Sequence, residues 1–542
     1  MRGLRPSGRG HHACFVSSGG ENPRYLWRGM SELRLYNTLT RKLEPFTPKT
    51  AGKAGVYLCG PTVYDVPHAG HARSAVAFDV LVRRLRAKGL QVTYVRNVTD
   101  VEDKILERSR KNGETPVELS RRMEAIYQTE IAAVGCLTPD RQPRVSEHMP
   151  QIVALIEKLV AHQSAYAVDM PGGTRDVYFA VRSFAGYGKL SRRRIDELQA
   201  GARVEKDENK HDPLDFALWK GAPREEWGYE SPWGWGRPGW HIECSAMSAH
   251  YLGHNFDVHC GGMDLVFPHH ENEIAQSEAA SPGAGEFARS WLHNGFLSVD
   301  KEKMSKSLGN FVTVEDVLAR NDAEAFRWFL MTVSYRGPMQ FDTETLADGR
   351  VVFPGVDEAE RRVDYLYGSA RRLKEIVASA MTAPARIPPE LAAHRDAVQK
   401  AAADAGAGLD DDLNTPVALA ALGEMARHGN ELSDLCAKRK KDAGFLGSAA
   451  VVARTTVIAI EKLAKELGLL HASDEAYRRR TRERRLALRK LTAEQIEASI
   501  AERAAARGAK DFARADAIRR ELLDRGVELM DGARGTEWTA AV

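Results

Sequence analysis

Several features are scarce in this chain. Its 542 residues include only six cysteines, which are widely spaced and form no Cys-x-x-Cys pair, so neither a disulfide framework nor a zinc finger is indicated. No continuous apolar run approaches the roughly 20 residues that a membrane span needs. The formal net charge of +3 is too small to mark a nucleic-acid-binding protein by itself. These observations favour a cytoplasmic protein with reduced thiols and no membrane partner.

The N-terminal residues 1–31 also lack the pattern of a secretory signal, because they contain no apolar core. Their arginines leave a mitochondrial transit peptide open, although their glycines and prolines disfavour the helix that such a peptide forms. We expect a disordered N-terminal extension, with Met30 as the functional start of the chain.

Two lysines in a small, hydroxyl-rich loop form the most informative motif. Lys303 and Lys306 lie in the sequence Lys-Met-Ser-Lys-Ser, and Gly309 follows. Lysine is a compact, hydrated charge that can follow phosphate oxygens, while serine and glycine leave the backbone free to move. The loop predicts an enzyme that uses ATP for ligation. A solvated basic turn is the alternative for these five residues taken alone.

A strand–helix–strand unit lies far upstream of this loop. Residues 56–59 predict a buried strand, apolar residues at helical spacing follow His71, and residues 92–98 predict the next strand. In such a parallel sheet, ligands bind beyond the carboxyl ends of the strands. The sequence His68-Ala-Gly70-His71 would open the helix there, where two imidazoles can stabilise an α-phosphate and Gly70 lets adenine approach the backbone. A helix start with ordinary histidines is the alternative.

Together the two elements resemble the signatures of class I aminoacyl-tRNA synthetases. Four further blocks, at residues 57–65, 96–100, 238–247 and 267–273, are similar to cysteinyl-tRNA synthetases, and the similarity extends over residues 33–538. Two positions depart from the family pattern. Ala69 stands where a larger aliphatic residue is usual, and Cys260 replaces a glycine. We expect Cys260 to be a packed thiol, with an additional metal ligand as the alternative.

The resemblance implies a reaction in which ATP activates L-cysteine as cysteinyl-adenylate before transfer to tRNA(Cys). It assigns catalysis to His68, His71, Lys303 and Lys306. The same four residues, with Gly70 and Asp264, would bind ATP and its Mg²⁺. The pocket for the amino acid would be lined by Cys59, Thr99 and Trp240.

The resemblance further implies one Zn²⁺ per chain, held by Cys59, Cys244, His269 and Glu273. From the residues alone, His269 and Glu273 are four apart on an expected helix and share one face. Each residue also has an ordinary alternative, as a buried thiol or a surface charge pair. Zinc would separate cysteine from serine, because a thiolate is the better ligand. A zinc protease is not indicated, because its second histidine position holds Ile274.

The expected fold class is an α/β Rossmann-like catalytic domain with a parallel sheet, followed by an α-helical bundle and a small C-terminal anticodon-binding module. The expected parts are a disordered extension (1–31), the first half of the catalytic domain (32–150), an insertion (151–235), the second half (236–300), a segment with the lysine loop (301–349), a helical bundle with a basic linker (350–490) and the C-terminal module (491–542).

Basic residues gather in the second half of the chain, at residues 371–374, 438–441 and 478–485. They would give tRNA phosphates a track, although solvated helix faces are the usual alternative. By the resemblance, bases of the anticodon would contact Arg507, Phe512, Asp516 and Asp531. A charged helix surface is the alternative for these four residues.

Two other functions stay open at this point. One is a related ligase that joins cysteine to a sugar amine, which the module after residue 491 argues against. The other is an inactive RNA-binding paralogue, which the intact histidine and lysine elements argue against. We expect a monomer.

Overall fold

The computed structural model describes residues 31–170, 173–194, 209–299, 302–303, 311–347, 349–379, 386–532 and 535–542. The expected N-terminal extension therefore lies outside the described residues, apart from residue 31. Lys306 also lies outside them, and for Lys303 the backbone alone is described.

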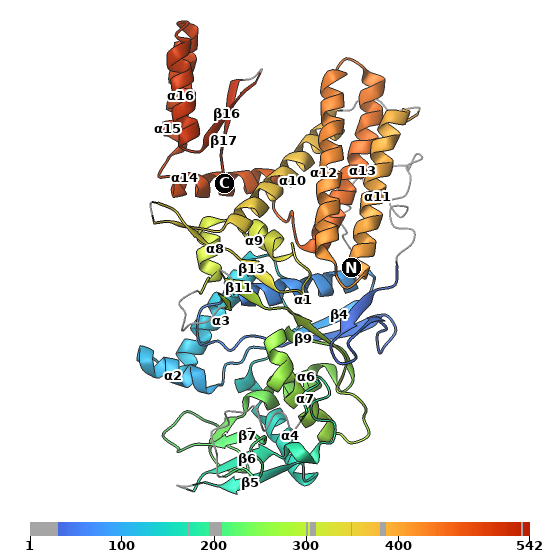
Figure 1. Ribbon diagram of the computed structural model, residues 1–542, viewed down its shortest axis with the longest axis vertical. Coiled ribbons are helices and arrows are strands. Elements are labelled where there is room, and N and C mark those ends of the chain that lie inside the picture. The colour runs from blue at the N-terminus through green and yellow to red at the C-terminus, as the bar shows by residue number, and fades with distance from the viewer. Residues whose placement is uncertain are drawn as a thin grey trace, which may run out of the picture.

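The centre of the molecule is a four-stranded parallel sheet in the order β10-β9-β3-β4 (Figure 1). Its strands are β3 (Lys53–Leu58), β4 (Gln91–Arg96), β9 (Phe256–Gly262) and β10 (Ala288–Asn294). The helices around it are α1 (Ala69–Ala87), between β3 and β4, and α6 (Trp240–Leu252) and α7 (Glu271–Ala279), before and after β9. The expected parallel sheet is confirmed.

Both faces of this sheet are covered, which explains the apolar character of its strands. On one face Val56 and Leu58 pack with Phe78 of α1. On the other face Tyr57 packs with Ile242 of α6. Because successive residues of a strand point to opposite faces, the carboxyl end of β3 delivers the next residue, Cys59, to a fixed side of the sheet.

Two smaller groups of elements adjoin the central sheet: those that flank β3 and β4 in the chain, and those of the insertion. A hairpin of β1 (Arg34–Asn37) and β2 (Lys42–Pro45) precedes β3, and helices α2 (Asp103–Asn112) and α3 (Pro116–Ala133) follow β4. The insertion contains α4 (Met149–Ala161) and an antiparallel sheet of β5 (Ala165–Asp169), β6 (Arg175–Phe179), β7 (Phe216–Gly221) and β8 (Gly236–Pro238). This sheet continues past the expected boundary at residue 235.

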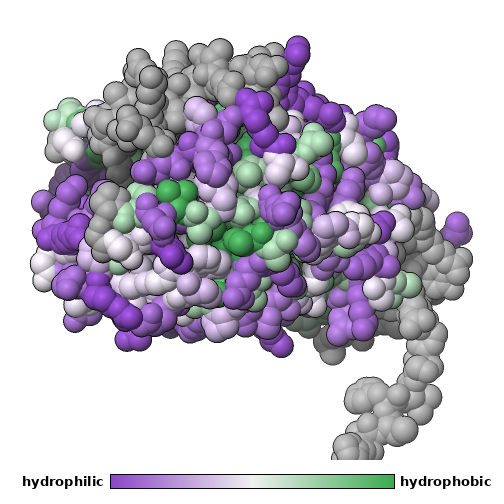
Figure 2. All heavy atoms as spheres, turned by 90° about the horizontal axis from the view of Figure 1, so that it is seen from below, coloured by the Kyte–Doolittle hydropathy of each residue, from purple (hydrophilic) through white to green (hydrophobic). Residues whose placement is uncertain are grey.

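The insertion forms one end of the molecule (Figure 1). Seen from that end, the surface is mostly hydrophilic, with small apolar patches near its centre (Figure 2). The core of this part, which includes Phe179, Leu218 and Trp219, is continuous with the core under α6 and α7. The insertion is therefore packed onto the catalytic sheet.

The segment after β10 joins the sheet to the helical part of the chain. It begins with β11 (Leu297–Val299), which pairs with β12 (Glu302–Lys303) and β13 (Met339–Phe341). Between β12 and β13 lie α8 (Val314–Arg320) and α9 (Ala323–Leu330), and the short pair β14 (Glu344–Thr345) and β15 (Val351–Val352) follows β13.

Four long helices form the expected bundle: α10 (Pro354–Ser379), α11 (Pro389–Asp410), α12 (Thr415–Lys438) and α13 (Ala443–Leu467). Within the described part of the chain, α13 is the one helix long and apolar enough to cross a membrane, by length and composition only. It is mostly buried and contacts α10, α11 and α12, so it is a core helix of the bundle. Counting continuous apolar runs missed it because Arg454 and Thr455 interrupt the run.

The C-terminal module has two helices, α15 (Ala493–Gly508) and α16 (Phe512–Asp524), and a hairpin of β16 (Val527–Gly532) and β17 (Gly535–Ala540). It stands beside the bundle on α14 (Asp474–Leu488) (Figure 1). Its core includes Ile496, Ile518 and Trp538, together with Leu486 of α14. The module is therefore attached to α14 through an apolar core.

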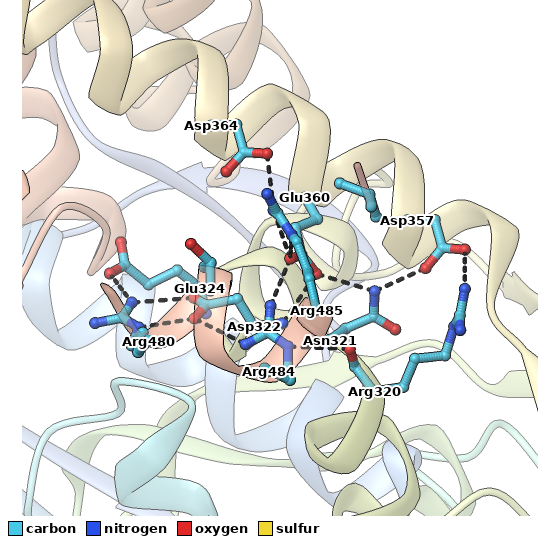
Figure 3. Close-up of polar contacts among 12 residues, drawn as sticks. Arg320, Asn321, Asp322, Glu324, Asp357, Glu360, Asp364, Arg480, Arg484 and Arg485 are labelled. Atoms are coloured by element: carbon cyan, nitrogen blue, oxygen red, sulfur yellow. Dashed lines mark hydrogen bonds and ion pairs between the residues drawn. The ribbon is translucent and has the colours of Figure 1, made fainter. Parts of the chain in front are cut away.

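The basic run at residues 478–485 is divided between the interior and the surface: Arg480, Arg484 and Arg485 bind internal carboxylates, while Arg478, Arg479 and Arg482 are exposed, so the phosphate track stays a prediction for the exposed side chains. Arg480 donates to Asp322 (Nε–Oδ2 2.7 Å) and to Glu324 (Nη2–Oε1 2.9 Å) (Figure 3). Arg485 donates to Glu360 through Nε (3.0 Å) and Nη2 (2.7 Å), and Arg484 binds the same carboxylate. These arginines clamp α14 to α9 and α10. The expected basic linker is thus a docked helix.

We predict that replacing Glu360 by alanine destabilises the junction strongly. Glu360 is 1% exposed, and its removal takes the shared carboxylate from buried Arg485 and half-buried Arg484, which typically costs about 3–5 kcal/mol. The midpoint of urea unfolding, followed by fluorescence, measures the loss.

Glu358 on the same helix is the matched control, because its pairs with Arg361 and Arg362 are solvent-exposed. Glu358→Ala is expected to change stability by less than about 1 kcal/mol. Equal shifts for the two variants would contradict an internal role for the arginine run.

Candidate functional site

A pocket of about 380 Å³ lies at the carboxyl ends of the sheet strands. It brings together most of the site residues expected from the sequence: Cys59, His68, Gly70, His71, Thr99, Trp240, Cys244, Asp264 and His269. A larger hollow of about 500 Å³ among α9, α10 and α12 is lined by none of them. The chemistry-bearing residues therefore meet where a parallel sheet binds its ligands.

The side chains of His68 and His71 cap the first turn of α1 by accepting hydrogen bonds from its backbone. The Nδ1 atom of His68 accepts from the backbone N–H of Gly70 at 3.1 Å, and the Nδ1 atom of His71 accepts from that of His68 at 3.2 Å. The two rings stack with centroids 3.7 Å apart. Because each Nδ1 accepts, the hydrogen of each neutral ring belongs on Nε2. Two N–H donors at a helix N-terminus suit an anionic ligand.

The segment after the lysine loop is joined to this histidine element. The backbone N–H of Ala69 donates to the carbonyl of Val312 at 3.0 Å, and that of Val314 donates to Pro67 at 3.0 Å. The ring of Phe311 meets the ring of His68 edge-on, with centroids 4.7 Å apart. At the start of the loop, the backbone of Lys303 in β12 pairs with that of Ser298 in β11. The roles of Lys303 and Lys306 stay predictions, since their side chains lie outside the described part.

Three of the four expected metal ligands converge within bonding distance of one point. The Sγ atom of Cys59 lies 3.7 Å from Nε2 of His269 and 3.5 Å from Oε1 of Glu273. Nε2 of His269 lies 3.1 Å from Oε1 of Glu273. Zinc–ligand bonds of about 2.0–2.3 Å in a tetrahedron separate the ligand atoms by about 3.3–3.8 Å. The observed spacing therefore fits a small tetrahedral cation.

The fourth expected ligand, Cys244, lies beside this group. Its thiol interacts with Cys59 and His269, and the contact with Cys59, opposed by burial, lowers the pKa of Cys244 to about 6. The group whose atoms lie within 4.8 Å of one another contains His270 instead of Cys244. The sequence alone could not indicate that His270 would join this group, because His270 directly follows His269 and both are histidines.

Buried polar atoms at this place support the fit to a cation. Glu273 is fully buried, and its Oε2 atom has no hydrogen-bond partner among the described residues. Burial alone would raise the pKa of the Glu273 carboxyl, but the imidazoles of His259 and His269 outweigh it and hold that pKa at about 2. The Nε2 atom of His270 is also buried without a hydrogen-bond partner. A cation bound by these groups would satisfy their lone pairs.

Sequence reasoning missed further histidines around the group. Nε2 of His259 lies 3.4 Å from Oε2 of Glu273, and Nδ1 of His241 lies 3.0 Å from Nδ1 of His269. Such contacts orient first-shell ligands. For His241 the available signal was its position inside the family-like block at residues 238–247, whereas His259 lies outside all four blocks. Cys260, in contrast, is fully buried in the apolar cluster of Val56 and Leu58, which agrees with a packed thiol.

Two residues expected to line the amino-acid pocket, Trp240 and Thr99, are held in place by contacts with neighbouring side chains and by a close approach of two loops. The ring of Trp240 stacks on His269 with centroids 4.5 Å apart. Thr99 accepts from Asn97 at 3.3 Å, and Asn97 accepts from the backbone N–H of Gly60 at 2.8 Å. A Cβ atom at Gly60 would lie 1.7 Å from the backbone oxygen of Asn97. The loops after β3 and β4 can approach this closely because position 60 carries no side chain.

The residues expected to read the anticodon lie on three elements of the C-terminal module. Arg507 is on α15, Phe512 and Asp516 are exposed on α16, and Asp531 is on β16. The Asp531 carboxylate accepts from Arg503 at 2.8 Å and pairs with Arg507 at 3.1 Å. Arg507 and Asp531 are therefore bonded to each other, while the ring of Phe512 is 62% exposed.

A second group that could hold a metal ion, His394, His428 and Glu431, lies between α11 and α12. Its own hydrogen bonds explain it. Arg427 Nη2 lies 3.0 Å from Nε2 of His428, so that nitrogen accepts and Nδ1 carries the hydrogen. This Nδ1 lies 3.1 Å from Nδ1 of His394. Nδ1 of His428, the nitrogen that faces the group, is therefore a hydrogen-bond donor to His394, so the group is explained without a metal ion.

We predict that Gly60→Ala lowers the thermal unfolding midpoint, because its Cβ atom overlaps the backbone of Asn97 and forces the two loops apart, at about 1–3 kcal/mol or more. Differential scanning calorimetry measures it. Gly423→Ala in α12 is the control, because nothing lies within 4 Å of its Cβ position and alanine favours a helix. A Gly60→Ala midpoint equal to that of the unchanged protein would refute the close approach.

Comparisons with known proteins agree with this geometry. The family model described as "tRNA synthetases class I (C) catalytic domain" matches residues 45–350, and the DALR domain model matches residues 406–471. The cysteine–tRNA ligase of Anaeromyxobacter dehalogenans (strain 2CP-1) is 48% identical over 509 residues, which cover 93% of this chain and 99% of that protein. That of Oleidesulfovibrio alaskensis is 45% identical over 513 residues, covering 94% and 100%.

The solved structures add agreement in fold. Mycobacterium tuberculosis methionyl-tRNA synthetase in complex with methionyl-adenylate matches with a TM-score of 0.57 at 17% identity, over 77% of this chain and 91% of that chain. At this identity the likeness concerns the fold alone. The fold class expected from the sequence is confirmed.

Proposed function

Because the chain belongs to the cysteine–tRNA ligase family, a class I aminoacyl-tRNA synthetase family, we propose that it ligates L-cysteine to tRNA(Cys) in two steps. In the first, the carboxylate of cysteine attacks the α-phosphate of ATP, which gives cysteinyl-adenylate and releases pyrophosphate. In the second, a hydroxyl at the 3′ end of tRNA attacks the adenylate carbonyl and AMP leaves. Mg²⁺ accompanies the ATP.

Fixed positive charge and N–H donors carry the first step in this proposal. His68 and His71 direct donor nitrogens from the start of α1 toward the α-phosphate. Lys303 and Lys306 stabilise the leaving pyrophosphate from the loop whose following residues contact His68. Such preorganised groups stabilise charge in the transition state without a covalent intermediate on the protein. Gly70 and Asp264 border the same pocket and complete the expected ATP site.

The metal group selects the amino acid. Cys59, Cys244, His269 and Glu273 would hold Zn²⁺, and the buried lone pair on Glu273 supports this fit. When bound, zinc supplies a Lewis acid that prefers a thiolate to a hydroxyl, which distinguishes cysteine from serine. Trp240 packs on His269 and Thr99 borders the pocket, so these two side chains shape the space for the substrate.

Recognition of tRNA falls to the C-terminal module. Exposed Phe512 offers a stacking surface, and Arg507, Asp516 and Asp531 offer polar edges to unpaired bases. The cysteines of the described part are all free: Cys59, Cys136, Cys244, Cys260 and Cys436. Free thiols suit a reducing compartment, so we propose a cytoplasmic protein. We also propose that it is a monomer.

The single observation that carries this function is the meeting of the metal group and the histidine element in one pocket, in a chain whose curated relatives are cysteine–tRNA ligases over nearly its whole length. The same relatives leave no support for the sugar-amine ligase or for an inactive paralogue.

We predict that the purified protein retains about one zinc ion per chain, as measured by elemental analysis. Cys244→Ser should lose most of the metal and the preference for cysteine over serine in ATP–pyrophosphate exchange. Cys436→Ser is the matched control, since Cys436 is a buried thiol of α12, remote from the pocket. Active protein without metal, or a Cys244→Ser variant that keeps both properties, would refute the assignment.

We predict that removing residues 491–542 spares cysteine-dependent ATP–pyrophosphate exchange but lowers tRNA charging on the order of 100-fold, because the module's binding energy positions the acceptor end for the second step. Both reactions are measured on the same preparation. Asp516→Ala is a milder companion, since Asp516 is exposed and outside the module core. Charging that survives the truncation would assign another role to the module.

A further inference from the structure

Arg73 of α1 is a buried cation that no expected role accounts for. It is 2% exposed and borders the active-site pocket. Its Nη2 atom donates to the backbone carbonyls of Ser334 and Tyr335, both at 3.4 Å, and to that of Gly337. Its Nε and Nη1 atoms are buried without a hydrogen-bond partner among the described residues. Three donor hydrogens of this guanidinium are therefore unused.

No described carboxylate pairs with Arg73, which distinguishes it from another buried arginine on the same helix. Arg84 is 3% exposed and binds Asp410 (2.9 Å) and Glu466 (2.8 Å). Taking a charge out of water without a counter-charge is unfavourable. Burial accordingly lowers the pKa of the Arg73 guanidinium to about 10. The group still carries its charge at neutral pH, so an anion from outside the protein would be stabilised beside it.

The carbonyls that Arg73 binds belong to a turn that supports another part of the pocket wall, at residues 294–297. The backbone N–H of Gly295 donates to the carbonyl of Tyr335 at 2.8 Å. A Cβ atom at Gly295 would lie 2.3 Å from the carbonyl oxygen of Gly337. Residues 294–297 of this wall border the same pocket as His68 and His71. Through the turn, Arg73 ties the wall to the helix that carries the two histidines.

We propose that Arg73 is a positioning residue for the nucleotide, one that holds the wall at residues 294–297 against α1 and whose charge is balanced by the phosphates of bound ATP. The inference rests on the proposed function in that ATP is the nucleotide. Because Nε and Nη1 are buried, Arg73 acts through the wall and through its charge, without a direct bond to substrate. Its effect therefore grows with the number of phosphates on the ligand.

Calorimetric titration of adenosine, AMP and ATP–Mg²⁺ into the full-length protein tests this. Arg73→Met keeps a side chain of similar length without charge or donors, and Arg73→Lys keeps the charge without the planar fork. Arg73→Met should weaken ATP binding by roughly 10- to 100-fold, the range for losing the attraction between two unit charges roughly 6–12 Å apart at an effective dielectric constant of about 20. AMP should lose less and adenosine least. Arg73→Lys should fall between Arg73→Met and the unchanged protein for ATP.

Arg84→Met is the matched control, with the same helix, the same residue type and similar burial. It should lower the thermal midpoint, because it removes the buried guanidinium that binds Asp410 and Glu466, yet keep the ATP affinity of the folded protein. In ATP–pyrophosphate exchange, Arg73→Met should raise KM for ATP while KM for cysteine stays unchanged. A purely structural Arg73 would instead reduce the active fraction and leave both KM values alone.

Three results would overturn the inference: unchanged ATP affinity in Arg73→Met, equal weakening for adenosine and ATP, or equal weakening by Arg73→Met and Arg84→Met. Should Arg73→Met fail to fold, Arg73→Lys decides, and unchanged ATP affinity in it refutes the positioning role. Failure of the proposed function is distinct, because it would appear as ATP binding without cysteine-dependent exchange in the unchanged protein.

Discussion

The arrangement of the site depends on how β9 lies against β3. The backbone N–H of Cys59, one residue past β3, donates to the carbonyl of Cys260 in β9 at 3.0 Å, and Leu58 is registered opposite Cys260. A slip of one residue would turn Cys59 to the other face of the sheet, away from His269 and Glu273. The same register places Gly261 against His270. A Cβ atom at position 261 would lie 2.7 Å from the imidazole of His270. Strand pairing thus sets the spacing of the metal group.

Buried charge is handled in two different ways in this chain. At the junction of α9, α10 and α14, each buried carboxylate meets arginines, so Asp322, Glu324 and Glu360 become a structural clamp. At the pocket, Nε and Nη1 of Arg73 have no hydrogen-bond partner among the described residues, and Oε2 of Glu273 has none beyond its 3.4 Å ion pair with His259. A satisfied network stabilises a fold, whereas unsatisfied groups in a pocket are typical of a ligand site. This contrast is the basis for assigning the arginines of α14 to the junction and for proposing a substrate role for Arg73.

Local sequence predicted what depends on local sequence. The strand before Cys59 and the helix that opens at His68 follow from periodicity and helix-start signals, and the structure has them. The contact of His269 with Glu273 follows from helical spacing. What the sequence could not disclose were partners distant along the chain. Arg485 finds Glu360 across 125 residues, so part of a basic run that suggests a solvated track is internal. The family resemblance, rather than any spacing, grouped Cys59 and Cys244 with His269 and Glu273, and it could not say how His270 would lie.

The central claim is that Cys59, Cys244, His269 and Glu273 form a zinc centre that takes the thiol of the substrate as a further ligand. X-ray absorption at the zinc edge tests it most directly, because it counts sulfur neighbours of the metal separately from nitrogen and oxygen. The account predicts two sulfur ligands from the protein alone and a third at about 2.3 Å when L-cysteine is added, with no change on L-serine. A sulfur count that L-cysteine leaves unchanged, or that L-serine changes equally, would contradict it.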